Sequence, residues 1–352
     1  MFAIVTTGTG GYDKMEYRQV PVPTPRTGEV LLRVLAAGVN NTDINTRLGW
    51  YASAVTGATG EADATAQANP ASGWNGPTPF PLIQGVDCCG EVVKVGEASK
   101  LRPGVALGSR VLVRPCMRTA GFDEMECEWL GCSRDGAFAE YVTVPASEVF
   151  AIHCDWSDAE LASTPCAYGT AANMLHKAAL GAGEDVLVTG ASGGVGSAAV
   201  QIASSIGGRV TAICGTEKQQ RILELGAQAA LDRSEDLTAA LGEHSTDLVV
   251  DVVGGPMFGA LLSLLRPGGR YVTAGAIAGP VVDLDLRTLY LNDLRLIGST
   301  AWEEPVFPAL LKWIQEGKLK PAIARTYPLR EIAEAQRYFM EKRHVGKIVL
   351  IP

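Results

Sequence analysis

A chain of 352 residues, with 47% hydrophobic and 19% charged residues, has the length and composition of a globular protein with two domains. Its formal net charge of -8 excludes a basic surface that would attract nucleic acid or anionic lipid over the whole molecule. No apolar run reaches the length of a membrane span, and the first residues have the pattern of a strand instead of a signal peptide, so we expect a cytoplasmic protein.

The first part of the chain, up to about Val144, has the pattern of short strands separated by Gly and Pro. Strands are predicted at 1–5, 29–36, 90–95, 110–114 and 137–144. Between Ala52 and Pro79 the residues are mostly small or polar with little periodicity, which predicts a long surface loop between strands. This part is therefore expected to be mainly β.

From about Trp156 onward, strands and helices alternate. Strands are predicted at 186–189, 209–214, 248–253, 270–274 and 294–298. Strands separated by helices imply right-handed crossovers and a parallel sheet. Helices at 305–316 and 329–342 and a strand at 347–351 follow, and we expect this last segment to return to the first domain.

The segment 185–206 has the order of a dinucleotide-binding unit: a buried strand, a glycine-rich turn and a helix of small residues. Gly193 lets the backbone approach a pyrophosphate, Gly196 lets the helix pack close to the strand, and the helix N-terminus offers N–H groups to the anion. The alternative is a tight turn without a ligand. The predicted cofactor contacts of this loop are Gly190, Ser192, Gly193, Gly194, Val195 and Gly196.

The following strand ends at Cys214, where such folds contact the adenosine ribose. The carboxylate that would bind a free 2′-hydroxyl is missing at this strand end, so NADP(H) is favoured over NAD. Gly215 and Thr216 leave room for a 2′-phosphate, and Lys218 is the candidate to pair with it. Glu217 weakens this inference, and the alternative for Lys218 is a solvated residue at a helix start.

Several ordered motifs lie along the chain: AGVNNTD at 37–43, RLGWY at 47–51, GVDCCG at 85–90, DGAFAEYV at 135–142, CAYGTA at 166–171 and GKIVL at 346–350. Together with the glycine-rich loop, they resemble the medium-chain dehydrogenase/reductase superfamily, in its zinc-independent quinone oxidoreductase-like branch. The resemblance implies an α/β protein. Its Rossmann doubly wound parallel sheet would occupy 158–300, and a GroES-like, mainly-β catalytic domain would comprise 1–157 and 301–352.

The zinc alcohol dehydrogenases of this superfamily hold a catalytic zinc at three positions that align with Asn40, Val86 and Cys166 in this sequence. Because valine cannot coordinate a metal and one cysteine cannot hold the ion alone, we expect no catalytic zinc. Asp43 and Asp87 lie nearby in sequence, and we expect them to anchor loops through hydrogen bonds.

The eight cysteines lie mostly in apolar stretches, which predicts buried thiols without a need for disulfides. Cys116, Cys127 and Cys132 are more widely spaced than the four cysteines of the family's structural zinc lobe, so a structural metal is not expected there. The four histidines fit no acid/base or metal spacing, and no catalytic histidine is assigned.

Without a metal to polarise an alkoxide, reduction of a conjugated double bond is favoured over simple alcohol oxidation. By resemblance, Asn40 and Tyr51 line the substrate cleft, where they would donate hydrogen bonds to the oxyanion of a quinone or an α,β-unsaturated carbonyl compound. The alternatives are that Asn40 caps a turn and that Tyr51 packs beside Trp50. The resemblance also implies that the nicotinamide is contacted by Thr170, Gly275, Ala276 and Ile277.

The leading hypothesis is thus an NADPH-dependent oxidoreductase acting on a small molecule. A zinc-type alcohol dehydrogenase of the same superfamily and a dinucleotide-binding protein with little catalysis stay open as alternatives. By resemblance we expect a homodimer or a homotetramer, which would assemble through an edge strand in the segment 271–278. The sequence does not identify the substrate, because specificity in such a fold depends on loops and on the shape of the substrate site.

Overall fold

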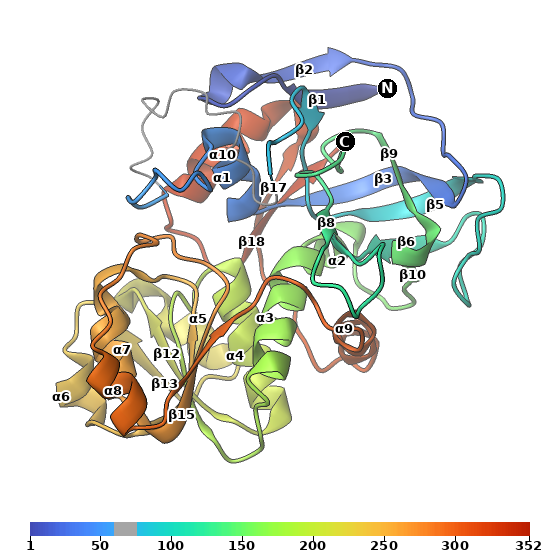
Figure 1. The fold of residues 1–352 in the computed structure, drawn as a ribbon. Helices are drawn as coiled ribbons and strands as arrows, with labels where there is room; N and C mark the ends of the chain where they lie inside the picture. Colours follow the sequence, from blue (N-terminus) through green and yellow to red (C-terminus); the bar gives the residue numbers. More distant parts are fainter. Residues whose placement is uncertain (60–75) are drawn as a thin grey trace. The chain divides into compact units, whose positions relative to one another are not determined.

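The computed structural model describes residues 1–59 and 76–352 (Figure 1), so most of the predicted loop at 52–79 lies outside the described residues. The chain divides into two compact units. Counting described residues only, unit 1 comprises 1–55, 76–166 and 321–352, and unit 2 comprises 56–59 and 167–320. Each unit has its own core.

Unit 1 is mainly β, as predicted. Its strands are β1 (Phe2–Thr6), β2 (Met15–Gln19), β3 (Glu29–Val39), β4 (Leu82–Ile83), β5 (Cys89–Val95), β6 (Arg110–Val113), β7 (Cys116–Met117), β8 (Glu128–Trp129), β9 (Tyr141–Pro145), β10 (Val149–Ala151), β17 (Ile323–Pro328) and β18 (Lys347–Ile351). Three helices accompany them: α1 (Asn41–Leu48), α2 (Asp158–Ala162) and α10 (Ile332–Met340).

The long strand β3 organises unit 1. It pairs with β5, β9 and β18, and these strands belong to a seven-stranded sheet in the described part of the chain. Apolar residues that alternate along β3, such as Val30, Leu32 and Val34, point into a core shared with β1 and α10. The antiparallel pairing of β18 with β3 confirms that the end of the C-terminal segment returns to the first domain, whereas its first predicted helix, at 305–316, lies in unit 2.

Unit 2 contains a six-stranded, fully parallel sheet with the order β13-β12-β11-β14-β15-β16. Its strands are β11 (Asp185–Val188), β12 (Arg209–Cys214), β13 (Ala229–Asp232), β14 (Thr246–Asp251), β15 (Leu265–Thr273) and β16 (Arg295–Gly298). Its helices are α4 (Gly194–Ile206), α5 (Gln219–Glu224), α6 (Leu237–Leu241), α7 (Phe258–Ser263), α8 (Leu286–Leu291), α9 (Val306–Gln315) and most of α3 (Pro165–Lys177).

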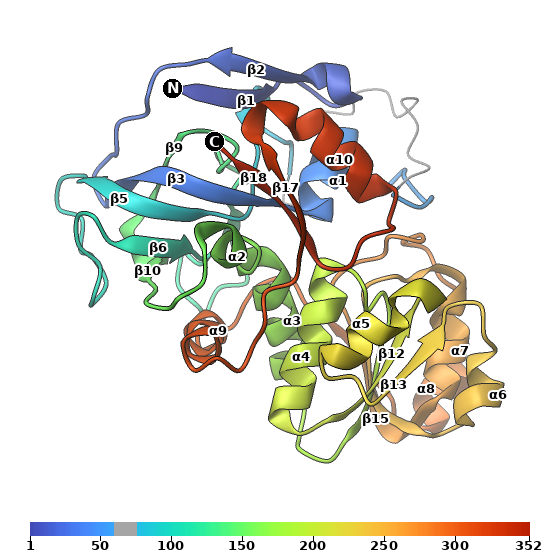
Figure 2. The ribbon, with the colours of Figure 1, turned by 180° about the vertical axis from the view of Figure 1, so that it is seen from behind.

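Helices α4 and α5 lie on one face of this sheet, and α7 and α8 lie on the other (Figures 1 and 2). The strand order reverses at β11, which has β12 on one side and β14 on the other. In such doubly wound sheets, ligands bind outside the carboxyl ends of the strands at the point of reversal. The glycine-rich turn at the end of β11 is therefore at the expected position for a cofactor.

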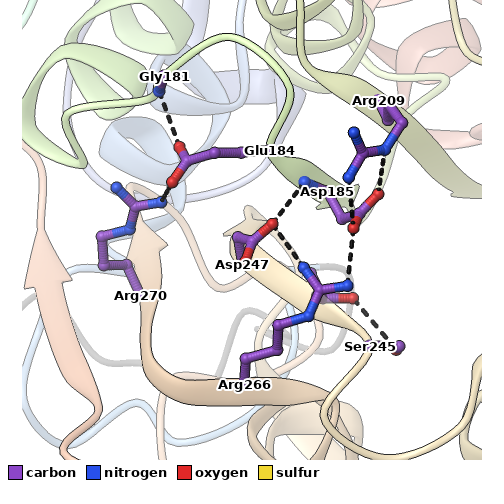
Figure 3. A network of polar contacts seen from close by, with 9 residues as sticks. Gly181, Glu184, Asp185, Arg209, Ser245, Asp247, Arg266 and Arg270 are labelled. Carbon is purple, nitrogen blue, oxygen red and sulfur yellow. Dashed lines mark hydrogen bonds and ion pairs between the residues drawn. The ribbon is translucent and has the colours of Figure 1, made fainter.

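The opposite, amino-terminal edge of the sheet carries a network of ion pairs (Figure 3). Asp185 at the start of β11 accepts from Arg209 of β12 and from Arg266 of β15, and Arg266 also contacts Asp247 of β14. Single surface ion pairs contribute little, but a network that joins four strands holds their starts in register. The ion pairs thus connect the amino ends of the strands, and the proposed ligand site is at their carboxyl ends.

Two predictions about boundaries differ from the structure. The units divide after Cys166 and Lys320, later than the expected 157 and 300. The second difference arises because Trp302 packs against Gly169, where an added Cβ would lie 2.1 Å from the indole, and because Lys320 N donates to Gln201 Oε1. These contacts hold residues 301–320 in unit 2.

The predicted edge strand at 271–278 is wrong. Residues 271–273 belong to β15, which is paired on both sides, with β14 and with β16. In the described part of the sheet, the strand at this edge is β16. Exposed apolar residues occur in β16, at Leu296, and in the chain segment that precedes it, at Val281, Leu286, Tyr290 and Leu291.

Candidate active site and cofactor site

The predicted phosphate-binding loop has the backbone that a dinucleotide requires. Gly190 follows β11 with φ of 56°, a left-handed conformation that favours glycine. An added Cβ on Gly196 would lie 2.2 Å from Gly190 O, so this glycine allows α4 to pack close to the loop. At Gly193 an added Cβ would meet only Gly190 O, at 3.4 Å, so the space in front of this residue is open.

Gly193 is also the N-cap of α4, and a glycine has no side chain with which to cap the helix. The first turn of a helix leaves its N–H groups without intrahelical acceptors, and together with the helix dipole they form an anion site. The open surface at Gly193 and the uncapped helix N-terminus together fit a pyrophosphate. The structure thus brings Gly190, Ser192, Gly193, Gly194, Val195 and Gly196 into one loop.

The predicted adenosine end of the site contains a carboxylate that the sequence did not reveal. Asp232, the last residue of β13, accepts hydrogen bonds from Thr216 N at 2.7 Å and Thr216 Oγ1 at 2.6 Å. Ser234 donates two more, and these hydrogen bonds hold the pKa of Asp232 below its ordinary value. Asp232 is therefore an ionised clamp that fixes the Gly215-Thr216 turn.

Two cationic residues are associated with the same turn. Lys218 closes the turn through a bond from its backbone N–H to Gly215 O, and its ammonium lies 3.7 Å from the Glu217 carboxylate. Arg233 follows β13, and its backbone N–H donates to Cys214 O, the last residue of β12. Arg233 is exposed, and its guanidinium forms no ion pair within 1–59 and 76–352. Sequence reasoning missed Arg233, although a charged residue directly after a strand of the sheet was the available signal.

The predicted nicotinamide segment Gly275, Ala276 and Ile277 follows β15 and is partly exposed. Thr170, on α3, is also only partly buried. The neighbouring loop after β14 is joined to this segment, because Ala278 N donates to Val253 O at 2.8 Å. The predicted cofactor residues after β11, β12 and β15 thus all follow carboxyl ends of strands in one sheet.

A buried carboxylate, Asp251, connects these loops at the end of β14. It accepts from Thr189 Oγ1, which precedes the phosphate loop, and from Tyr271 Oη. The backbone N–H groups of Val253 and Gly254 donate to it as well, at 2.8 and 3.1 Å. Burial, reinforced by this carboxylate, raises the pKa of the Tyr271 phenol, so Tyr271 is a donor. One side chain therefore fixes the geometry of two loops.

In unit 1, the predicted catalytic residue Asn40 lies in a buried polar cluster. Lys347 Nζ, which is 2.9 Å from Asp87 Oδ2, also donates to Asn40 Oδ1. Asn40 Nδ2 donates to Asp87 Oδ2 at 2.8 Å. Asp87 Oδ1 accepts from Cys166 N at 2.6 Å. Sequence reasoning assigned loop anchoring to Asp87 but missed Lys347, which is far from the others in sequence.

Asp43 completes the surroundings of Asn40. Its carboxylate accepts from Asn40 N at 2.8 Å and from Gly85 N and Val86 N at 3.2 and 3.3 Å, so it anchors two chain segments. Burial raises the pKa of Asp43 to about 7, and the charge of Asp87 adds to the effect. Asn40 is the N-cap of α1, so the turn-capping role considered for it is present alongside any catalytic one.

Tyr51, the second predicted catalytic residue, is half-buried. Its hydroxyl lies 3.5 Å from Thr42 Oγ1, and its ring meets Trp50 edge-on at 5.6 Å between centroids, so the packing beside Trp50 is also present. Burial raises the pKa of the phenol, so it is protonated at neutral pH and can donate a hydrogen bond. Tyr51 and Asn40 flank α1, which joins them within unit 1.

The positions that align with zinc ligands do not fit the metal. Val86 has no donor atom, and Asn40 Oδ1 accepts a hydrogen bond from Lys347. Burial raises the pKa of the Cys166 thiol well above its ordinary value, so the thiolate that would bind zinc is disfavoured. Within the described residues, no group of three His, Cys, Asp or Glu side chains is arranged to hold a metal ion. All eight cysteines are free thiols, and seven are buried.

No helix within residues 1–59 and 76–352 is long and apolar enough to span a bilayer.

Two family models match the chain: the alcohol dehydrogenase GroES-like domain at 26–154 and the zinc-binding dehydrogenase at 225–350. The first match lies mainly in unit 1, and the second covers the later part of unit 2 and most of the C-terminal segment of unit 1.

Full-length relatives agree with this assignment. Acryloyl-coenzyme A reductase of Metallosphaera sedula is 31% identical, with 99% of both chains covered. Quinone oxidoreductase of Lama guanicoe is 29% identical, with 100% of this chain and 97% of the relative covered. A solved structure from Sinorhizobium meliloti 1021, provisionally described as an alcohol dehydrogenase, is 43% identical, covers 100% of this chain and 96% of that one, and has a TM-score of 0.88. The chain is therefore an oxidoreductase of the medium-chain dehydrogenase/reductase superfamily.

Proposed function

We propose that the protein is an NADPH-dependent reductase of quinones or α,β-unsaturated carbonyl compounds that works without catalytic zinc. When bound, the reduced dinucleotide supplies a hydride to the β-carbon of the substrate. The π electron pair of the double bond moves toward the carbonyl oxygen to form an enolate, which then takes a proton from water at the α-carbon. Reduction of the double bond is complete after these two additions.

The residues of unit 1 would stabilise the charge that develops on the carbonyl oxygen. Asn40 offers an amide N–H and Tyr51 a phenolic O–H, and neutral donors of this kind are suited to an oxyanion. Preorganised donors are effective because they need no reorientation during the reaction. The observation that carries the proposal is the cluster of Asn40, Asp87 and Lys347 at the aligned metal position, where the side chains offer hydrogen bonds in place of metal ligands.

The preference for NADPH is supported by the cations next to the adenosine turn. The backbone N–H of Lys218 donates to Gly215 O, and that of Arg233 donates to Cys214 O. Both residues are therefore neighbours of the position that a 2′-phosphate would take beside Gly215. Two acids oppose this preference. Asp232 has its oxygens occupied by four donors, and Glu217 is exposed, so its side chain can turn away at small cost. We therefore retain NADPH as the proposed cofactor.

The substrate class rests on the relatives as well as on the site. The M. sedula relative is an acryloyl-coenzyme A reductase, whose name describes the reduction of an α,β-unsaturated thioester, and the L. guanicoe relative is a quinone oxidoreductase. A zinc-type alcohol dehydrogenase is the second candidate. The description of the S. meliloti structure as an alcohol dehydrogenase favours that activity and says nothing of zinc. A dinucleotide-binding protein with little catalysis is the third.

We also propose a homodimer or homotetramer assembled through β16. This strand has one unpaired edge within the described sheet, and exposed apolar residues lie near it. An unpaired strand beside an apolar surface is suited to pairing with a second copy. Sedimentation of the purified protein tests this proposal: a monomer at micromolar concentration would contradict it.

The proposed function is tested by following NADPH absorbance with 1,4-benzoquinone, 2-cyclohexenone and acryloyl-coenzyme A. Turnover of at least one of these substrates is expected, with NADPH used more efficiently than NADH. Tight binding of NADPH without turnover of any of them would favour the non-catalytic alternative. Oxidation of a primary alcohol with NADP, in the absence of enone reduction, would favour the alcohol dehydrogenase.

A further inference from the structure

Lys347 is an almost fully buried cation, with a side chain that is 3% exposed. Its ammonium has three hydrogens and three acceptors: Asp87 Oδ2 at 2.9 Å, Val39 O at 2.9 Å and Asn40 Oδ1. All of its hydrogens are therefore used inside the protein. A buried lysine with this arrangement holds its acceptors in fixed positions.

The contact with Lys347 determines which way the Asn40 carboxamide faces. Because an ammonium can only donate, the atom of Asn40 that faces it has to be the oxygen. Nδ2 then faces Asp87 Oδ2 at 2.8 Å, which uses one amide hydrogen. The other hydrogen has Gly38 O at 3.4 Å, longer than an ordinary N–H···O bond. That hydrogen is only weakly used by the protein.

The ammonium also changes the strength of the amide as a donor. A hydrogen bond to Oδ1 withdraws charge from the carboxamide and makes the N–H a stronger donor, because linked hydrogen bonds polarise one another in a medium of low dielectric constant. The negative charge of Asp87 balances the positive charge of Lys347, so the ion pair has no net charge. Gly38 is required beside it, since an added Cβ would lie 2.4 Å from Asp87 Oδ2.

We propose that Lys347 is a positioning residue, which with Asp87 holds and polarises the Asn40 carboxamide so that its second, weakly bonded Nδ2–H is presented to the carbonyl oxygen of the substrate. This inference rests on the proposed function. A purely structural ion pair is the competing explanation. The strands that Lys347 connects are already paired through Ile348 with Val39 and Val349 with Gly38, so the ion pair is not needed to join them.

The test replaces the ion pair by neutral side chains of similar size, in the double variant Lys347→Met/Asp87→Asn. Removing both charges avoids leaving one buried charge unpaired, which would be strongly destabilising. A matched control is another buried pair of unit 1, Arg114 with Glu148, whose Nε and Oε2 atoms are 2.6 Å apart. The control variant Arg114→Met/Glu148→Gln removes equivalent charges away from Asn40.

For 2-cyclohexenone, we expect the first double variant to lower kcat by roughly tenfold, because removal of an oxyanion donor costs about 10² to 10³ and misalignment costs less. KM for NADPH should stay within about twofold, since neither residue belongs to the cofactor loops. The control variant should retain its kcat. Unchanged kcat in Lys347→Met/Asp87→Asn, or an equal loss in both double variants, would overturn the inference.

A second measurement is independent of turnover. The infrared carbonyl stretch of labelled cyclohexanone, bound together with NADP, reports the hydrogen bonds to its oxygen. We expect a lower frequency for ketone bound to the wild type than to Lys347→Met/Asp87→Asn, with the control variant equal to the wild type. Equal frequencies in all three proteins would overturn the inference, whereas a wild type that shows this shift but reduces no enone would contradict only the proposed function.

Discussion

Replacing Gly193 by valine should separate cofactor binding from folding. An added Cβ at Gly193 makes only an ordinary contact, 3.4 Å from Gly190 O, and the backbone there is extended with φ of -76° and ψ of 173°. Valine tolerates this conformation. We expect the free energy of unfolding to change by less than about 1 kcal/mol, the range of a surface or N-cap substitution.

The effect on the dinucleotide should be much larger. The valine side chain would occupy the open space where a pyrophosphate has to approach the N–H groups of α4. Loss of two hydrogen bonds to a charged group at about 1.5 to 3 kcal/mol each corresponds to at least about 3 kcal/mol, or a weakening of roughly a hundredfold.

Fluorescence titration with NADPH measures the affinity, and urea unfolding measures the stability. Gly196→Ala provides the contrast, because its Cβ would lie 2.2 Å from Gly190 O and should destabilise the unit itself. An unchanged NADPH affinity in folded Gly193→Val would refute the assignment of this loop to the pyrophosphate.

Lys218→Ala and Arg233→Ala should each weaken the affinity for NADPH by about tenfold and leave the affinity for NADH nearly unchanged. Arg287→Ala, at an exposed control position, should alter neither affinity. Equal effects on both cofactors in titrations would contradict a role in binding the 2′-phosphate. Tyr51→Phe should lower kcat for 2-cyclohexenone by about tenfold or more without changing the melting temperature, and an unchanged kcat would eliminate the phenol as a donor. Burial raises the pKa of Asp43 from 3.8 to about 7, so the folded state binds a proton that the unfolded state has lost in this range; stability should fall as pH rises from about 4 to about 7. Asp43→Asn should flatten that part of the curve in urea unfolding at several pH values, and an unaltered slope would show that Asp43 is not the group responsible.

Much of the fold could be predicted because it depends on local patterns. The strands at 209–214 and 347–351 have the predicted bounds, since each is a compact apolar run between turn residues. The strand–turn–helix structure at 185–206 was predictable for the same reason, because its glycines, strand and helix are contiguous in sequence. The resemblance to the superfamily added the fold type of each domain, GroES-like for one and Rossmann for the other.

What could not be predicted depends on contacts between distant residues. Lys347 and Asn40 are separated by 307 positions, and no local pattern indicates that the ammonium contacts the amide oxygen. Asp232 ends β13, whereas Thr216 lies in the turn after β12, so its carboxylate was not considered at the adenosine turn. The limit of unit 2 was placed too early because the contact of Trp302 with Gly169 also links distant segments.

The central claim is that this chain reduces activated alkenes without a metal. Its most direct test is NADPH consumption with 2-cyclohexenone and 1,4-benzoquinone, measured together with primary alcohol oxidation and the metal content of the same preparation. The account predicts turnover of the enone or the quinone by protein without stoichiometric zinc, unaffected by chelators. Alcohol oxidation that chelators abolish, with about one zinc per chain, would contradict it.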